Sequence, residues 1–225
     1  MLKNLFPSYV FNSDATKLDI FEDIQEEIKQ YLATKTPNYL SWFGKTHKLY
    51  EKSFAAEDAN LLGHCPSLKS FIVDQIIKFS LQIKPNDAVE SNIDSLVISS
   101  SWATKFDDGD YAHQHHHMPD EISGVYYYQV PEQTPLNTEK NNRYEGHLYF
   151  VSPVAGHYVS LMTAPLQKVF IKPKEGQLIL FPSYLEHGVM TCNNKKKARI
   201  SISFNASIHH NLAIKNLKER DKETE

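Results

Sequence analysis

The sequence predicts a mainly β protein, a double-sheet jelly roll or barrel with N-terminal helices packed on one sheet. Three observations support this fold class. Short β-rich runs follow one another after residue 92, turn residues (Gly, Pro and Asn) separate these runs, and two helical patterns precede them. Runs of this kind are typical of all-β sandwiches and barrels.

The N-terminal part is predicted to support the β core. Residues 6–12 are aromatic and β-branched, as in a short strand. Apolar residues recur at three- and four-residue steps over 18–32, and a second apolar stripe begins at Pro66 and ends before Lys84. Both patterns predict amphipathic helices. Residues 35–60 show no sustained period, so no element is predicted there.

The predicted core contains eight β-rich runs, and the stretch 131–146, with two prolines and three asparagines, is predicted to be a long loop or lid. Trp102, within the first run, is expected in the core rather than at a substrate. The runs lie at 95–104, 122–130, 147–151, 157–162, 167–172, 177–181, 187–191 and 198–205.

We expect a single domain over residues 1–225. It would consist of a strand and helical support (1–92), the β core (93–207) and a charged tail (208–225). A net charge of −3 gives no support for binding to nucleic acid or to an anionic membrane.

The two cysteines, Cys65 and Cys192, lack the spacing of a disulfide framework or a thiolate metal site. The chain also contains no apolar run of the roughly 18 to 20 residues that a membrane span needs. We therefore expect a cytoplasmic protein.

A cluster of histidines precedes the second β run. On an extended strand, His113, His115 and His117 would project from one face, while Gln114 and His116 would point the other way and are predicted non-ligands. Imidazoles that converge in this manner are typical metal ligands.

A distant segment could complete this site. His187 follows an apolar strand and a proline turn, and Arg199 comes twelve residues later, on one face of a predicted strand with Ser201 and Ser203. An arginine aimed into an apolar barrel requires an anion, and its planar fork fits a carboxylate, to which Ser201 could also donate.

Together these segments resemble the Fe(II)- and 2-oxoglutarate-dependent oxygenases. The resemblance rests on an HxHxxxxxSGVYY motif that begins at His115, on FPSYLEH ending at His187, and on RISISFN beginning at Arg199. It covers roughly residues 95–207 and is greatest for a group common in marine bacteria and their phages. It implies a double-stranded β-helix, cupin-like core and a hydroxylase that uses Fe(II), 2-oxoglutarate and O2 and releases succinate and CO2.

Carried over by residue, the resemblance makes His115, His117 and His187 the metal ligands. Arg199 and Ser201 would bind the distal carboxylate of 2-oxoglutarate, and Tyr127 would contact it. The prime substrate and the oligomeric state are not implied.

The chain departs from the usual facial triad, which contains two histidines and one carboxylate. His117 takes the place of that carboxylate. Asp120 or Glu121 could supply the acid if the loop folds back, and His113 is a further possible ligand. We rank His117 first because a two-residue step on a strand needs no bend.

Two other functions are compatible with the sequence. A cupin-type metal enzyme or sensor without 2-oxoglutarate would use His115, His117, Glu121 and His187, but the cupin signature has glycine where Tyr128 stands. A metal-free jelly-roll binding module is the third possibility, and the convergence of histidines argues against it.

Overall fold

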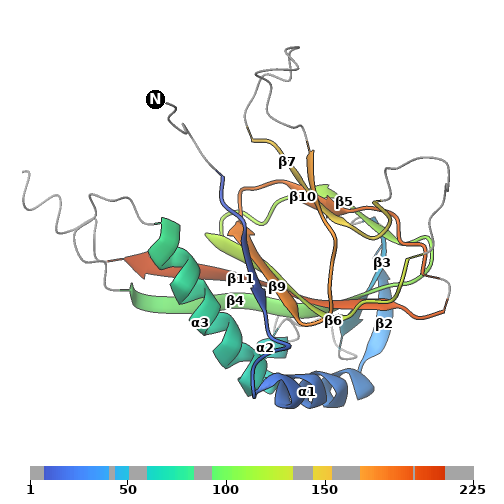
Figure 1. Cartoon of the computed structure of the whole chain (residues 1–225), viewed down its shortest axis with the longest axis horizontal. Coiled ribbons are helices and arrows are strands. Elements are labelled where there is room, and N and C mark those ends of the chain that lie inside the picture. The colour runs from blue at the N-terminus through green and yellow to red at the C-terminus, as the bar shows by residue number, and fades with distance from the viewer. Residues whose placement is uncertain are drawn as a thin grey trace, which may run out of the picture.

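A computed structural model describes residues 8–40, 44–50, 60–83, 93–133, 144–153, 168–194 and 196–210. Strands form the body of the molecule, and the helices lie together along one side of it (Figure 1). The predicted run at 157–162 and residues 211–225 of the predicted tail (208–225) lie outside the described residues, whereas 208–210 belong to the last strand rather than to a tail.

Two long helices occur where the apolar stripes predict them. Helix α1 spans Phe21–Ala33 and helix α3 spans Pro66–Ile83, with the short helix α2 (Leu61–His64) immediately before α3. The carboxylate of Glu27 on α1 accepts hydrogen bonds from the backbone N–H groups of Ser67 and Leu68. Because the first N–H groups of a helix have no intrahelical partner, this contact caps α3 and joins the two helices.

Seven of the eight predicted β runs coincide with strands. Strand β1 begins five residues later than the predicted N-terminal strand. Strands β2 and β3 fall in the region where no element was predicted. The strands are β1 (Phe11–Asp14), β2 (Thr36–Leu40), β3 (Gly44–Tyr50), β4 (Ile93–Phe106), β5 (Tyr111–His115), β6 (Ile122–Gln129), β7 (Leu148–Val151), β8 (Lys168–Ile171), β9 (Gln177–Pro182), β10 (His187–Val189) and β11 (Arg199–His210).

The strands pair antiparallel in the order β1-β9-β6-β11-β4-β3-β5-β10-β7-β8, and β2 adds to β3. The path folds over at β3, which pairs with β4 on one side and with β5 on the other. Two sheets therefore face each other, as the jelly-roll prediction requires. The first contains β9, β6, β11 and β4, and the second contains β5, β10, β7 and β8.

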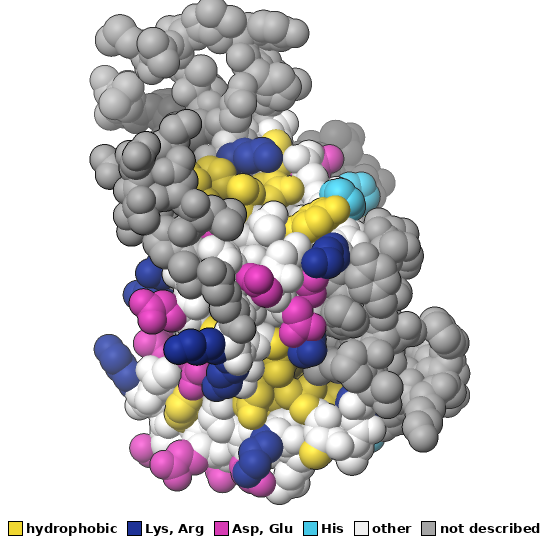
Figure 2. All heavy atoms as spheres, turned by 90° about the vertical axis from the view of Figure 1, so that its right-hand side faces the viewer, with side chains coloured by type: hydrophobic (Ala, Val, Ile, Leu, Met, Phe, Trp, Pro, Cys, Tyr) yellow, Lys and Arg dark blue, Asp and Glu magenta, His cyan; other side chains and the backbone are white. Residues whose placement is uncertain are grey.

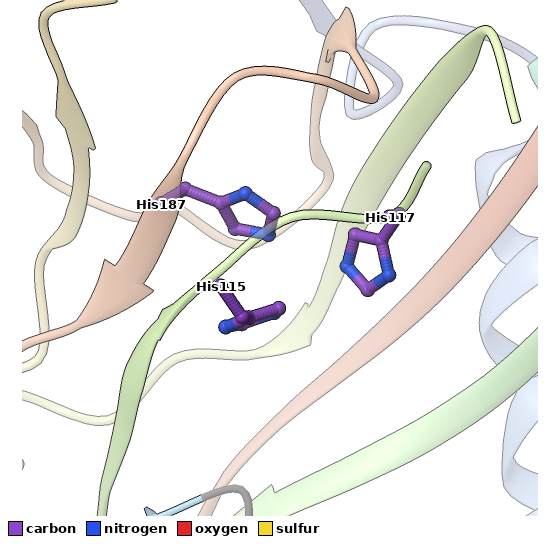
Figure 3. Close-up of side chains that lie close together, drawn as sticks. All are labelled: His115, His117 and His187. Atoms are coloured by element: carbon purple, nitrogen blue, oxygen red, sulfur yellow. The ribbon is translucent and has the colours of Figure 1, made fainter. Parts of the chain in front are cut away.

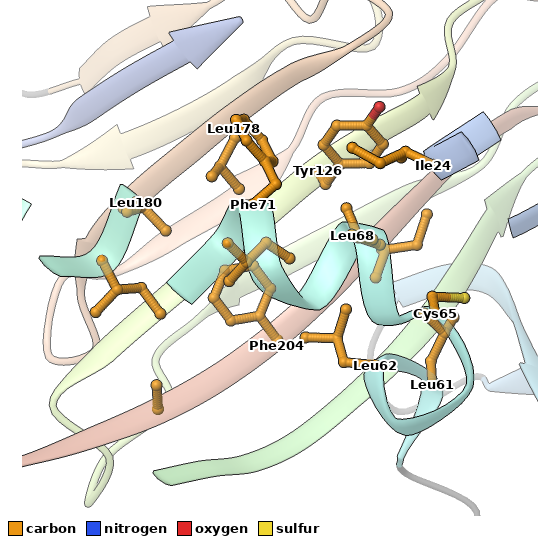
Figure 4. Packing of buried hydrophobic residues seen from close by; sticks show 14 of the residues in the cluster. Ile24, Leu61, Leu62, Cys65, Leu68, Phe71, Tyr126, Leu178, Leu180 and Phe204 are labelled. Atoms are coloured by element: carbon orange, nitrogen blue, oxygen red, sulfur yellow. The ribbon is translucent and has the colours of Figure 1, made fainter. Parts of the chain in front are cut away.

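The outer face of the first sheet packs against the helices. Tyr126, Leu178 and Phe204 project from three adjacent strands onto α1 and α3 and form the main hydrophobic core (Figure 4). Gly124 on β6 leaves room for the ring of Phe204, because a Cβ at this glycine would overlap that ring. The helices bury this face and leave the inner face free for other chemistry.

A second hydrophobic cluster fills part of the space between the sheets. Val125 and Tyr127 on β6 contribute to it from the first sheet, and Leu148 and Phe150 on β7 contribute from the second. Side chains alternate along each strand, so neighbours on β6 belong to different cores.

The membrane-spanning potential, the surface charge and the cysteines can be described for the same part of the chain. No described helix is long and apolar enough to cross a membrane. On the face shown in Figure 2, described acidic and basic side chains lie next to one another rather than forming a basic stripe. Cys65 and Cys192 are both buried and unpaired with each other.

Candidate active site

Three histidines converge between the sheets at one end of the barrel. His115 is the last residue of β5 and His187 is the first residue of β10, where the two are direct partners across the strand pair. His117 lies two residues beyond β5. The ring centroids are 4.4 Å apart for His115 and His187, 5.0 Å for His115 and His117, and 5.1 Å for His117 and His187. Figure 3 shows the three rings pointing toward a common centre.

Backbone carbonyls orient two of the imidazoles. The Nδ1 atom of His115 lies 2.6 Å from the carbonyl oxygen of His113, and Nδ1 of His187 lies 2.9 Å from that of Leu185. A carbonyl oxygen only accepts hydrogen bonds, so Nδ1 of each ring must carry the proton. In this tautomer Nε2 of each ring carries a lone pair and is the potential metal ligand, an arrangement common among metal-binding histidines.

The electrostatics of His187 favour the same state. Burial lowers the pKa of His187 well below its usual value, and the neighbouring His115 lowers it further. The ring is therefore neutral at pH 7, which is the form that binds metal ions.

The three rings fit a single first-row metal ion. One potential ligand atom from each histidine can be chosen so that all three lie within 4.8 Å of one another. Metal–nitrogen bonds of about 2.1 Å allow two ligands of one ion to be at most about 4.2 Å apart, so a small inward movement is sufficient.

His117 joins the cluster for a different reason from the one the sequence suggested. Strand β5 ends at His115, so regular alternation along a strand does not position His117. Instead, its backbone N–H donates to the carbonyl oxygen of Ser183 at 2.9 Å, which ties it to the turn after β9. The sequence correctly placed His117 beside the other two histidines, but a turn rather than a strand brings it there.

Both alternative carboxylates are bound elsewhere. The hydroxyl of Ser99 donates to Asp120 at 2.7 Å, and Glu121 accepts the backbone N–H of Ile208 at 2.5 Å. Within the described residues the histidine cluster includes neither acid. The four-ligand cupin set, which requires Glu121, is therefore not assembled.

The remaining histidine-rich residues lie outside the cluster. His113 is exposed and its ring packs against that of Tyr111. Gln114 donates to Glu186, and His116 accepts the backbone N–H of Met118. The structure thus separates both predicted non-ligands, and His113, from the three converging rings.

Arg199 lies in the same cavity as the histidines. It begins β11, is 1% exposed, and its guanidinium carbon lies 4.8 Å from the ring centroid of Phe106 and 5.0 Å from that of Tyr127. Its Nη1 donates to the carbonyl oxygen of Gly146, whereas its Nε has no partner. Among the described residues no carboxylate pairs with it. Leaving such a cation unpaired is costly, so the site favours an anionic ligand.

The cavity wall continues along the inner face of β11. Ser201 and Ser203 line it with Arg199, as their shared parity predicts. Tyr127 does not line the cavity. It packs beside the guanidinium, and its buried hydroxyl has no hydrogen-bond partner.

One buried residue has a second role that the sequence interpretation did not include. Trp102 is buried, as expected of a core residue, and it also lines the cavity, with its ring centroid 5.8 Å from that of His117. Thr104 lines it too and was not considered. Both lie opposite the inward-facing serines, since Ser203 pairs with Trp102 and Ser201 with Thr104. Only knowledge that β4 pairs with β11 could have revealed this.

Solved structures share the architecture. A prolyl-4-hydroxylase from Pseudomonas putida has a TM-score of 0.52 at 12% identity, with 88% of this chain and 92% of that chain covered. HygX from Streptomyces hygroscopicus, with nickel, 2-oxoglutarate and hygromycin B bound, has a TM-score of 0.54 at 10% identity, with coverages of 89% and 83%. At these identities the likeness shows the fold alone, a double-stranded β-helix.

A third solved structure is similar to this chain over most of its length. A prolyl hydroxylase from Trichoplax adhaerens, in complex with a peptide fragment of the hypoxia inducible factor oxygen degradation domain, has a TM-score of 0.52 at 13% identity, with coverages of 88% and 83%. No curated protein matches this chain at a significant level.

A family model matches the core of the chain. Residues 100–205 match a family model described as "Putative 2OG-Fe(II) oxygenase", and this segment contains both histidine segments and Arg199. The core is thus similar to the 2OG-Fe(II) oxygenases, in the region where the sequence resemblance lies. Its narrower likeness to the marine bacterial and phage group stays a prediction, as do the single-domain organisation and the cytoplasmic location.

Proposed function

We propose that this protein hydroxylates an organic substrate with Fe(II), 2-oxoglutarate and O2, releasing succinate and CO2. In this proposal His115, His117 and His187 bind the iron. Arg199 and Ser201 bind the distal carboxylate of 2-oxoglutarate, and the hydroxyl of Tyr127 adds a donor beside them. When bound, the iron and its cosubstrate supply the oxidising chemistry.

One observation carries the proposal. A buried guanidinium with an unpartnered Nε and a cluster of three imidazoles line a single cavity. A dicarboxylate with a keto group is complementary to both, since one end can chelate a metal and the other can pair with arginine. The family match and the metal and 2-oxoglutarate bound to HygX support the same ligand pair.

The remaining residues of the site have positioning roles. The carbonyl groups of His113 and Leu185 keep two imidazoles in the metal-binding tautomer. The rings of Phe106 and Tyr127 both lie close to the guanidinium and help to hold it in place. Aromatic and aliphatic side chains form much of the cavity lining, and such surroundings strengthen electrostatic interactions among the buried groups.

Anaerobic titration tests the proposal. Adding Fe(II) and 2-oxoglutarate to the protein should produce the weak visible absorption band of a metal-bound keto acid. Arg199→Ala should weaken 2-oxoglutarate binding about 100-fold, because a buried charged partner is lost, and should change metal binding alone much less.

Lys197→Ala is the matched control, since it removes a positive charge two residues away that is exposed. It should leave both affinities unchanged. If Arg199→Ala binds 2-oxoglutarate as tightly as the unmodified protein does, the assigned role is wrong. If no band forms in the unmodified protein, the proposed function is wrong.

A further inference from the structure

The cavity contains an unusual set of charges for a site that binds a divalent cation. Among its described lining residues, Arg199 is the only one with a permanent charge, and that charge is positive. The three histidines bind metal in their neutral form. Two nearby acids, Asp120 and Glu121, are held by hydrogen bonds to other segments, and Glu186 pairs with Gln114.

We infer that 2-oxoglutarate supplies the negative charge that this metal centre lacks, so that metal and cosubstrate bind interdependently. The inference rests on the proposed function and goes beyond it. It concerns the order and coupling of binding, and it assigns the cause to a single position, His117.

The physical argument is a count of charges. A divalent metal and Arg199 place three positive charges in one largely buried cavity, and no described side chain that lines it offsets them. A usual triad would contribute one carboxylate to the metal. Here, 2-oxoglutarate brings two negative charges, one to each end of the cavity. Attraction between buried charges is weakly screened, so each ligand should increase the affinity of the other.

Thermodynamic linkage makes this coupling reciprocal. If 2-oxoglutarate strengthens metal binding by some factor, metal strengthens 2-oxoglutarate binding by the same factor. A centre of this type should release its metal readily when the cosubstrate is absent and retain it when the cosubstrate is bound.

His117 is the position at which the charge can be changed. It lies in a turn held by the carbonyl of Ser183 through its backbone, so replacing its side chain leaves that hydrogen bond available. His117→Asp would restore a carboxylate to the triad. His116→Asp is the matched control, since it makes the same change one residue earlier on an exposed side chain that lies outside the cluster.

The test measures binding of Mn(II), whose free-ion electron paramagnetic resonance signal disappears on binding, with and without saturating 2-oxoglutarate. In the unmodified protein and in His116→Asp, 2-oxoglutarate should increase Mn(II) affinity by roughly 100-fold. In His117→Asp, Mn(II) should bind about tenfold more tightly without cosubstrate, and the enhancement by 2-oxoglutarate should decrease to about tenfold or less.

A second measurement needs no variant, in case His117→Asp folds poorly. Acetate can donate one carboxylate oxygen to the metal, and acetamide is its neutral counterpart of similar shape. Acetate should strengthen Mn(II) binding to the unmodified protein about fivefold, after correction for its complex with free Mn(II), and acetamide should not.

The outcomes separate the two proposals. Equal Mn(II) affinity with and without 2-oxoglutarate, or equal effects of acetate and acetamide, would overturn the coupling and leave the proposed function intact. Equal enhancement by 2-oxoglutarate in His117→Asp and the unmodified protein would show that chelation rather than charge is responsible. Failure to bind Mn(II) in either condition would reject the proposed function itself.

Discussion

Tyr126 and Tyr127 are neighbours on β6, are both fully buried, and belong to different parts of the molecule. The ring of Tyr126 meets Phe71 edge to face in the helix-covered core, and its hydroxyl accepts a hydrogen bond from Gln25 at 3.4 Å. The ring of Tyr127 lies against Arg199 on the inner side, and its hydroxyl has no partner. Burial raises the pKa of both phenols, so both remain protonated at pH 7.

The comparison extends to the two faces of the whole first sheet. On the outer face, apolar side chains such as Ile202 and Phe204 are fully packed against helices. On the inner face, Arg199 and Ser201 are buried polar residues that line the cavity. The outer face is complete without a ligand, whereas the inner face leaves buried polar atoms unpaired. Buried polar atoms without partners are expected at binding sites, where the ligand supplies the missing hydrogen bonds.

The largest expected effect is on the outer face. Phe204→Ala should lower the free energy of unfolding by about 3–5 kcal/mol, because it removes a fully buried ring from the main core. Urea denaturation measures this loss. Ser203→Ala, one residue earlier and facing the cavity, should cost less than about 1 kcal/mol. Equal losses for the two variants would contradict the assignment of the faces.

The next largest effect is expected on metal affinity at the cluster of three histidines. His187→Ala should reduce Mn(II) affinity by at least about 100-fold because it removes a proposed ligand, while His116→Ala should leave the affinity within about twofold. Electron paramagnetic resonance titration measures both. If the two variants behave in the reverse way, the proposed ligand set is wrong.

The smallest effect separates the two tyrosines. Tyr127→Phe removes a buried hydroxyl that lacks a partner, so the free energy of unfolding should increase by about 1 kcal/mol while 2-oxoglutarate binding weakens severalfold. Tyr126→Phe removes a hydroxyl that has one long hydrogen bond, so stability should decrease by about 0.5 kcal/mol without any change in binding. Urea denaturation and 2-oxoglutarate titration distinguish these outcomes, and identical behaviour would remove the contrast between the two sides of β6.

Much of the fold could be predicted because its signals are local. The apolar stripes of α1 and α3 have a helical period, and most core strands are bounded by turn residues. Strands β2 and β3 have no such pattern. They are defined by pairing with each other and, for β3, with β4 and β5, which lie far away in the sequence. A single sequence does not report distant pairing.

Part of the histidine cluster could also be predicted, because two of its members belong to local sequence motifs. The motif identified His115 and His187 as candidates, and the structure makes them direct cross-strand partners. His117 was correctly predicted to lie beside His115 and His187. The prediction used the alternation of side chains along a strand, which does not apply to His117 because β5 ends at His115. The backbone hydrogen bond to Ser183 after β9 places it instead.

The sequence by itself determined the fold class, the resemblance of the core to a known family and the residue types available for a metal and a dicarboxylate, because these are properties of local pattern and motif. Tertiary structure alone decided which of His117, Asp120 and Glu121 lies beside the other histidines, and that Trp102 faces the cavity. The physical reason is that each of these placements depends on backbone hydrogen bonds between strands and turns distant in the chain, which fix side chains that local periodicity leaves undetermined.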